Sequence, residues 1–201
     1  SFLHPGMSEF SATLEKVAKA LENNSKRFEE LDSAAGDGDL GITAGKIAEG
    51  IRSGISLSTG DLKADLMMLG REISKSAPST FGTLFATGFI RASGVVSNDY
   101  SALENAQKGF QAAFEGIAAR GKASIGERTL LDALAPALTA LNDASDLRSG
   151  LSSAAIAARG GAKVTAEMMP RHGRAGWIGE RAKGLEDAGA NVIAVVFEAL
   201  Q

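Results

Sequence analysis

The chain has 201 residues, of which 44% are hydrophobic and 22% are charged, and its formal net charge is −3. This length and balance are typical of one soluble globular domain with a substantial core. The net negative charge and the presence of one Trp and one Tyr argue against a nucleic-acid surface. No apolar stretch approaches the roughly 20 residues that cross a membrane.

The absence of Cys excludes disulfides and thiolate metal sites, and two His residues are too few for a His-rich metal site. Any metal would be bound by oxygen ligands, which suits Mg²⁺ or Ca²⁺. Residues 1–7, SFLHPGM, resemble an expression-tag remnant. We expect a single domain over 8–201 and, because no signal-peptide pattern is present, a cytoplasmic protein.

Apolar residues recur at helical spacing along most of the chain. Leu62, Leu66, Leu69 and Ile73, for example, share one face, and Asp61 is placed to cap that helix. A further helix is expected to close at Asp32. The helix capped by Asp61 is expected over 61–74, and the other segments with helical spacing are 10–24, 43–55, 83–96, 100–121, 128–143, 145–169 and 189–200.

The last of these segments contains VIAVV, which is also compatible with a buried strand. Its place after Asp187-Ala-Gly and its FEAL ending favour a buried helix. The sequence thus indicates about eight helices, no confident strand, short Gly-rich connections and no internal repeat. We predict an all-α fold, an antiparallel bundle or barrel.

The stretch LDSAAGDGDLGIT, residues 31–43, holds three aspartates and three glycines. Asp37 and Asp39 are two apart, so in an extended segment their side chains point the same way, and a turn at Gly36 would bring Asp32 to meet them. Converging carboxylates raise each other's pKa unless a cation compensates, and Mg²⁺ with substrate phosphates commonly occupies such a site. The alternative is structural: Asp39 or Thr43 caps the following helix.

Three further segments have composition suited to phosphate binding or to helix capping. SAPSTFGTL, residues 76–84, places hydroxyls and Gly82 before a helix, which suits either a phosphate or a helix cap. RGKASIGERTLLDALAP, residues 120–136, puts Asp132 near a helix start that opens around Thr129. RHGRAGWIGERAKGLEDAGA, residues 171–190, carries several basic residues, which suit a phosphate clamp or a solvated face.

Together, and in this order, these segments resemble the L subunit of dihydroxyacetone kinase. The family pattern L-D-x-x-x-G-D-x-D-H-G-x-N corresponds to LDSAAGDGDLGIT, and G-D-K-T-M-x-D corresponds to GERTLLD at 126–132. The pattern G-R-A-S-Y-L-G-E-R-x-x-G-x-x-D-P-G-A corresponds to GRAGWIGERAKGLEDAGA at 173–190. The resemblance covers about residues 8–200.

The resemblance implies an antiparallel eight-helix barrel that binds ADP or ATP at one end, with the phosphates on two Mg²⁺ ions. The implied metal ligands are Asp32, Asp37 and Asp39. The implied nucleotide contacts are Leu40, Gly41, Ile42 and Thr43; the phosphate loop Ser79, Thr80, Phe81 and Gly82; Gly121 and Leu130 beside the base; and Arg174, Asp187, Ala188 and Gly189 closing the site.

The resemblance also implies transfer of a phosphoryl group to dihydroxyacetone or a related keto-sugar held by a K-type partner subunit. The phosphoryl donor, ATP or a phosphohistidine protein of the phosphotransferase system, is left open. No side chain of this chain is required as a nucleophile, so no catalytic residue is predicted. The protein would position the nucleotide and neutralise its charge through Mg²⁺.

The chain departs from the family pattern on the phosphate side. Leu40 replaces a His, Thr43 replaces an Asn, and 78–82 replaces G-G-x-S-G, with Phe81 where a small residue is expected. Ala188 replaces a Pro. Three readings therefore stay open: an active kinase subunit, a nucleotide-binding paralogue with little or no kinase activity, or a helical scaffold without nucleotide.

Overall fold

The computed structural model describes residues 8–169 and 183–201, and these contain nine α-helices, one 3₁₀ turn and no strand. The predicted all-α class is confirmed. No described helix combines the length and the apolar character needed to cross a membrane. The elements are α1 (Glu9–Asn23), α2 (Ser25–Ala35), α3 (Leu40–Ser56), α4 (Leu62–Ser76), α5 (Thr80–Ser93), α6 (Ala102–Gly121), α7 (Leu131–Asn142), α8 (Leu147–Val164), η1 (Thr165–Glu167) and α10 (Ala188–Leu200).

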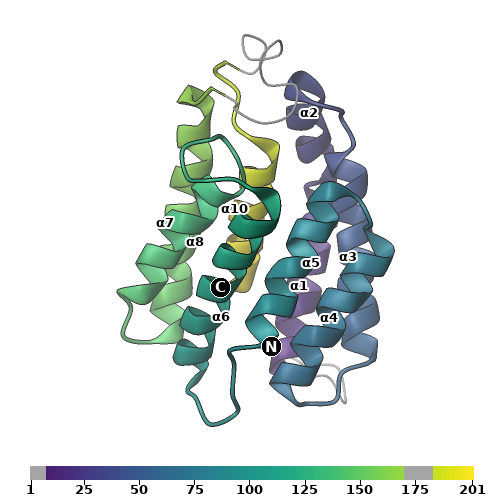
Figure 1. Cartoon of the computed structure of the whole chain (residues 1–201), viewed down its shortest axis with the longest axis vertical. Coiled ribbons are helices and arrows are strands. Elements are labelled where there is room, and N and C mark those ends of the chain that lie inside the picture. Colours follow the sequence, from purple (N-terminus) through teal and green to yellow (C-terminus); the bar gives the residue numbers. More distant parts are fainter. Residues whose placement is uncertain (1–7, 170–182) are drawn as a thin grey trace.

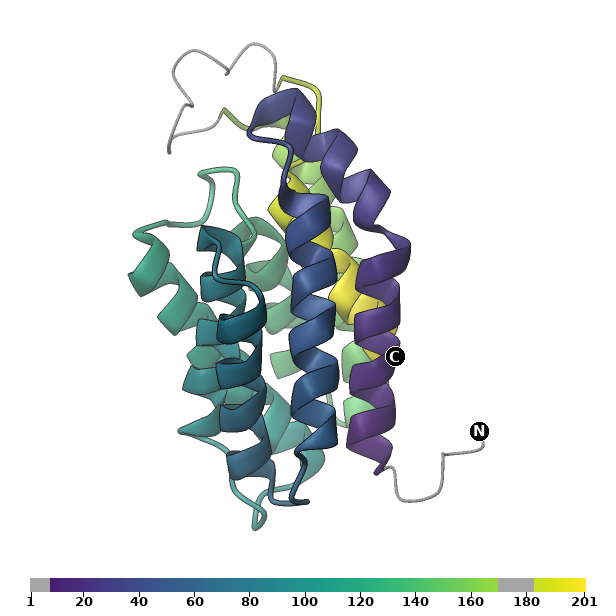
Figure 2. The same ribbon diagram turned by 90° about the vertical axis from the view of Figure 1, so that its right-hand side faces the viewer.

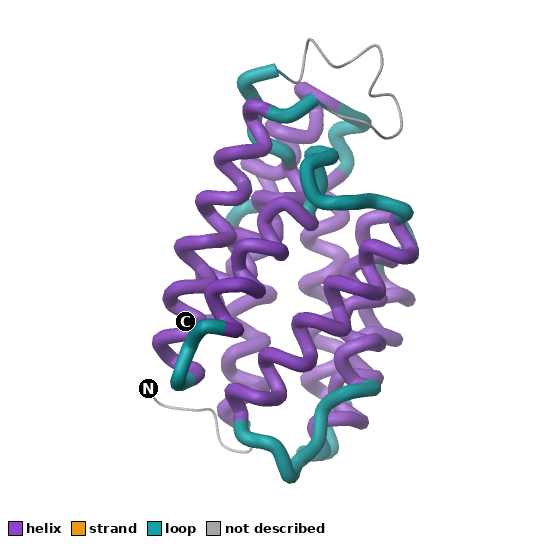
Figure 3. Tube along the Cα trace, turned by 60° about the vertical axis from the view of Figure 1, so that its left-hand side comes forward, coloured by secondary structure: helices purple, strands orange, loops and turns teal. Residues whose placement is uncertain are grey.

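Eight of these helices form a closed ring (Figures 1 and 2). In the order α1, α3, α4, α5, α6, α7, α8 and α10, each packs on the next, and α10 packs back on α1. Each helix runs opposite to its neighbours, so the loops gather at the two ends (Figure 3). The ninth helix, α2, lies at one end against α3 and α10. The antiparallel eight-helix barrel is therefore confirmed, with α2 added to it.

Short polar side chains fix where the helices begin. Asp61 caps α4 by accepting a hydrogen bond from the N–H of Ala64 at 2.9 Å, as predicted. In the same way, helices α5, α6 and α8 are capped by Ser79, Ser101 and Asp146. Each of these side chains accepts a hydrogen bond from the backbone N–H three residues later. Such caps satisfy N–H groups that have no partner inside the helix.

Several predicted boundaries shift by a few residues. The helix after the acidic loop begins at Leu40 and not at Thr43, because the carbonyl of Asp39 already accepts from the N–H of Thr43. The capped helix after residue 79 starts at Thr80, three residues before the predicted start. The helix expected from residue 128 begins only at Leu131. The segment 145–169 leaves the α-helical course at Thr165.

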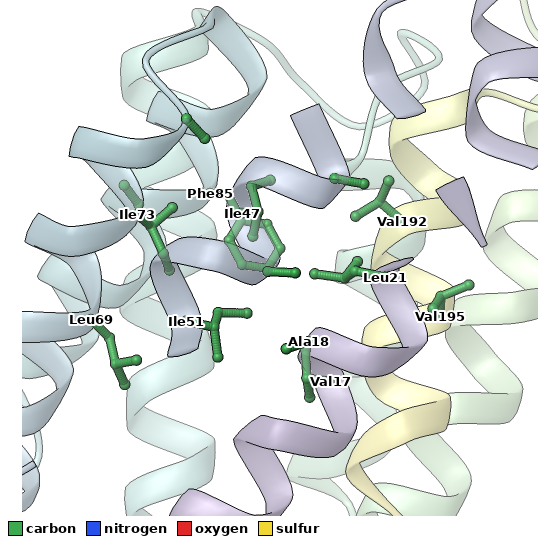
Figure 4. Packing of buried hydrophobic residues seen from close by; sticks show 14 of the residues in the cluster. Val17, Ala18, Leu21, Ile47, Ile51, Leu69, Ile73, Phe85, Val192 and Val195 are labelled. Carbon is green, nitrogen blue, oxygen red and sulfur yellow. The ribbon is translucent and has the colours of Figure 1, made fainter. Parts of the chain in front are cut away.

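The core has two parts that share α10. Val192 and Val195 of α10 face the first part, which is built from α1 to α5 and includes Leu21 and Ile47 (Figure 4). Ile193 and other α10 residues face the second part, built from α6, α7 and α8. Because α10 is covered on both sides, its sequence is apolar nearly all round. The prediction that VIAVV forms a buried helix is confirmed.

Candidate nucleotide and metal site

The alternating directions of the ring bring four helix starts to one end of the barrel. Helices α3, α5, α7 and α10 all begin there, beside α2 (Figure 1). We call this the Asp32 end. Free N–H groups and the positive ends of helix dipoles favour negatively charged groups near helix starts. The predicted site residues that the structure describes all belong to segments that begin or end here.

The acidic loop is held by Asp32, which lies in the last turn of α2. Its carboxylate Oδ2 accepts from the N–H of Leu40, the first residue of α3, at 3.0 Å. Its carbonyl accepts from the N–H of Gly36 at 2.6 Å. Gly38 has a φ of +77°, which favours glycine. The loop therefore turns back sharply, and at Gly38 the backbone between Asp37 and Asp39 is not extended.

Charge accumulates around Asp32. Burial raises the pKa of its carboxyl, the neighbouring Asp39 raises that pKa further, and the N–H of Leu40 opposes both effects. A cation would relieve the same repulsion. Among the described residues, no group of three or more His, Cys, Asp or Glu side chains lies close enough together to hold a metal ion. The donors present are all oxygen atoms, which fits Mg²⁺, and the assignment of Asp32, Asp37 and Asp39 as ligands stays a prediction.

The predicted phosphate loop lies directly beside the start of α3. The hydroxyls of Thr43 and Ser79 are 3.4 Å apart, and Ser79 also accepts from the N–H of Gly82 at 3.1 Å. Ser79 is thus a helix cap, one of the two roles considered for this segment. A Cβ at Gly82 would lie 2.0 Å from the carbonyl oxygen of Ala77, so only glycine fits this close approach.

Three predicted site residues from different segments meet at the start of α10. A Cβ built on Gly189 would lie 2.9 Å from Cε2 of Phe81 and 3.7 Å from Cβ of Leu130. Phe81 packs against both parts of the core. The bulky ring that replaces a small family residue is therefore accommodated by its contact with glycine. Ala188 is buried in the same first turn of α10.

The other predicted residues are less closely joined. Gly41 is buried where a Cβ would lie 2.4 Å from the carbonyl oxygen of Ser25, whereas Ile42 is 63% exposed. Thr80 begins α5, and Gly121 ends α6, where a Cβ would lie 3.5 Å from Leu84. Arg174 lies outside the described residues.

Asp187 links the start of α10 to the rest of the Asp32 end. Its carboxylate accepts from the N–H of Ala190 at 2.9 Å and caps the helix. Burial raises its pKa to about 6; the charge of Arg128 opposes this rise, while Asp132 and Asp32 add to it. Asp187 and Asp32, which are far apart in sequence, thus influence the same local potential.

Sequence reasoning missed two residues that organise this end. Arg128 is 6% exposed and donates from Nη1 to the carbonyl of Thr165 at 2.6 Å. Thr165 is fully buried and accepts from the N–H of Asp187 at 2.8 Å. A charged residue within GERTLLD was the available signal for Arg128, whereas Thr165 stands in a segment expected to be plain helix. Asp132, which was singled out, accepts from the N–H groups of Gly126 and Thr129.

An open hollow lies away from these residues, at the other end of the barrel. Its lining includes Tyr100, Lys108 and Glu115. The ammonium of Lys108 stands 4.9 Å from the centre of the Tyr100 ring. The hollow contains none of the predicted site residues, and we assign no role to it.

Comparison with known proteins gives a consistent result. A model of the DAK2 domain family matches residues 34–201. The chain is 29% identical over 188 residues to the PEP-dependent dihydroxyacetone kinase 1 ADP-binding subunit DhaL of Listeria innocua, with 93% of this chain and 91% of that protein covered. It is 32% identical over 196 residues to L-erythrulose 1-kinase of Mycolicibacterium smegmatis, where it covers 34% of the relative.

Solved structures show the same architecture. The dihydroxyacetone kinase of C. freundii superposes with a TM-score of 0.77 at 26% identity, covering 100% of this chain and 36% of that one. The same kinase in complex with AMP-PNP and Mg²⁺ also superposes with a TM-score of 0.77, at 25% identity. The chain therefore corresponds to nearly a whole DhaL subunit and to about a third of the longer kinases.

Proposed function

Since this chain belongs to the DAK2 domain family, we propose that it is the nucleotide-binding phosphotransfer component of a dihydroxyacetone or related keto-sugar kinase. It would bind ADP or ATP with Mg²⁺ at the Asp32 end. The observation that carries the proposal is the convergence there of four helix starts with the acidic loop, the Ser79 segment and the turn before α10. This arrangement supplies N–H donors for phosphate and carboxylates for a divalent cation.

The residues of this chain would act by binding and positioning. Asp32, Asp37 and Asp39 would hold the Mg²⁺ ions, which neutralise phosphate charge when bound. Leu40 to Thr43 and Ser79 to Gly82 would face the phosphates at the starts of α3 and α5. Leu130 and Gly121 would lie beside the base, and Arg174 with Asp187 to Gly189 would close the site. None of these side chains acts as a nucleophile in the proposal.

The keto-sugar would be held by a K-type partner, so this chain would present the phosphoryl group and not the acceptor. Relatives are named both as dihydroxyacetone kinase subunits and as erythrulose kinases, and the proposal extends to either substrate. Ile42 and Ile125 are 63% and 61% exposed in loops or helix starts at the Asp32 end. A K-type partner that docks at this end would cover these two side chains.

Two donors are compatible with the proposal. Relatives from Listeria innocua and Lactococcus lactis are named as PEP-dependent and PTS-dependent ADP-binding subunits. By analogy, this chain would retain ADP and be recharged by a phosphohistidine protein. If it instead follows the kinases that use ATP directly, its nucleotide would exchange freely.

A second candidate is a nucleotide-binding paralogue with little or no kinase activity. The observation that favours it is a set of replacements on the phosphate side: Leu40 and Phe81 carry no polar side-chain group, and Thr43 offers a hydroxyl in place of an amide. Phe81 fills space against Gly189 and Leu130. Binding would survive these replacements if the metal ligands and backbone N–H groups carry most of the phosphate contact.

The test is to denature freshly purified protein and identify any released nucleotide by chromatography, and then to melt the protein with and without Mg²⁺ and ADP. Near-stoichiometric ADP would support the cofactor-type subunit. No retained nucleotide together with a Mg²⁺-dependent rise in melting temperature would support an exchangeable site. If the protein releases no nucleotide and its melting temperature does not change with Mg²⁺ and ADP, the proposed function is contradicted and the scaffold alternative is favoured.

A further inference from the structure

Arg128 has an unusual backbone and an unusual environment at the same time. Its φ is +64°, in the left-handed region that side chains other than Gly, Asn and Asp rarely adopt. It is also 6% exposed, although arginine is seldom buried without partners. Residues persist in such conformations where the surrounding contacts determine them, and they concentrate at functional sites.

The contacts of Arg128 join three separate segments of the Asp32 end. Arg128 stands in the loop before α7, and its Nη1 donates to the carbonyl of Thr165, directly after α8. The hydroxyl of Thr165 donates to the carbonyl of Ala162 and accepts from the N–H of Asp187. Asp187 in turn caps α10. A continuous chain of hydrogen bonds therefore runs from the α7 loop through the end of α8 to the start of α10.

Charge supports the same link. The guanidinium of Arg128 lies where it attracts the Asp187 carboxylate, while Asp132 and Asp32 repel that carboxylate. Asp132 is itself buried and bonded to N–H groups of the Arg128 loop. A buried carboxylate without a compensating cation costs free energy. Arg128 supplies a buried positive charge that attracts the Asp187 carboxylate and offsets part of this cost.

We propose that Arg128 is a positioning residue for the nucleotide, whose buried guanidinium fixes the turn Asp187-Ala188-Gly189 against the α7 loop through Thr165. The inference rests on the proposed function, because it assigns this turn to nucleotide binding. Without the guanidinium, the α7 loop loses its hydrogen bond to Thr165, and the N–H of Asp187 then bonds to a Thr165 that is no longer held against that loop. The backbone N–H groups of the Asp187-Ala188-Gly189 turn would then be held less firmly in the orientation that binds the nucleotide, and the affinity for nucleotide would fall.

The test is calorimetric titration of ADP with Mg²⁺ into the full chain and into four variants. Arg128→Gly removes the guanidinium but suits the positive φ, so the backbone conformation is retained without strain. Arg128→Met removes the charge at similar length, and Arg128→Lys keeps the charge. Arg71→Met removes one exposed charge from α4 and serves as the matched control.

We expect the affinity of Arg128→Gly and Arg128→Met to fall roughly tenfold or more, the effect of losing a hydrogen bond to a charged group. Arg128→Lys should retain part of the affinity, and Arg71→Met all of it. Added guanidinium at millimolar concentration should restore affinity in Arg128→Gly and not in Arg128→Met, because only the glycine variant leaves the guanidinium site open.

Parent-like affinity in Arg128→Gly would overturn the positioning role while leaving the proposed function intact. If the unsubstituted chain itself fails to bind ADP with Mg²⁺, the proposed function falls, and this inference with it. The parent titration distinguishes the two failures. A cooperative melt of Arg128→Gly confirms that any lost affinity reflects the site and not unfolding.

Discussion

Asp187 shows how one residue can serve the fold at an electrostatic cost. Its carboxylate caps α10 and its N–H anchors the chain to Thr165. Burial and two neighbouring aspartates nevertheless raise its pKa to about 6, from an ordinary value of 3.8. A cap normally favours the ionised form, so desolvation outweighs the cap here. Such a shifted carboxyl group in a candidate site is typical of functional positions.

This shift predicts a pH dependence of stability with a definite sign. Between about pH 4 and pH 6 the folded chain holds a proton on Asp187 that the unfolded chain has released. The free energy of unfolding should therefore decrease as pH rises through this window, by up to about 3 kcal/mol. Asp187→Asn keeps a capping oxygen and cannot titrate, so its stability should lack this decrease. Denaturant unfolding at a series of pH values measures the difference.

Asp146 provides the control for that experiment. It also caps a helix, but it is exposed, and hydrogen bonds from Ser149 lower its pKa. Asp146→Asn should consequently leave the decrease between pH 4 and pH 6 in place. Equal pH slopes in the parent and in Asp187→Asn would show that the carboxyl titrates normally and that the burial described here is wrong.

At the scale of elements, small residues set how closely the helices approach. Gly160 and Gly161 are adjacent in α8 but face different surroundings. A Cβ on Gly161 would lie 2.2 Å from the carbonyl oxygen of Asp132 in α7, whereas a Cβ on Gly160 would meet nothing within 4 Å. The close approach of α7 and α8 therefore depends on one glycine of the pair.

The two glycines give a matched pair of substitutions. Gly161→Ala should destabilise the protein by about 1–3 kcal/mol, because the methyl group meets backbone that must move. Gly160→Ala should stabilise it by up to about 1 kcal/mol, through the higher helix propensity of alanine. Chemical denaturation of both variants checks the opposite signs. A neutral Gly161→Ala would mean that α7 and α8 are farther apart than described.

The sequence predicted the helices well because most of them carry an apolar stripe at helical spacing. Leu62, Leu66 and Leu69 repeat at helical spacing, and Asp61 before them is a recognisable cap. Boundaries were less accurate at the Asp32 end. The helix α3 begins at Leu40, three residues before the predicted start at Thr43. Its first hydrogen bond is accepted by the backbone carbonyl of Asp39, and a backbone carbonyl leaves no mark in the sequence. The positive φ of Arg128 is likewise fixed by tertiary contacts and has no local signal.

At the scale of the whole molecule, the alternating ring decides where a site can lie. An even number of antiparallel helices places four starts at each end, and one of those ends also receives α2 and the acidic loop (Figure 1). Periodicity alone could not give the ring order or show that Phe81 meets Gly189. The family resemblance provided the grouping of the site segments. The described segments lie at the same end of the barrel, while their roles in a nucleotide and metal site remain predictions.

The central claim is that the Asp32 end binds a nucleotide through Mg²⁺, and one calorimetric experiment tests it most directly. ADP is titrated into the chain with and without Mg²⁺, and the titration is repeated with Asp37→Ala and with Asp99→Ala, an exposed aspartate at the opposite end. We predict Mg²⁺-dependent binding in the parent and in Asp99→Ala, and its loss in Asp37→Ala. Binding that needs no Mg²⁺, or that Asp37→Ala leaves unchanged, would contradict the account.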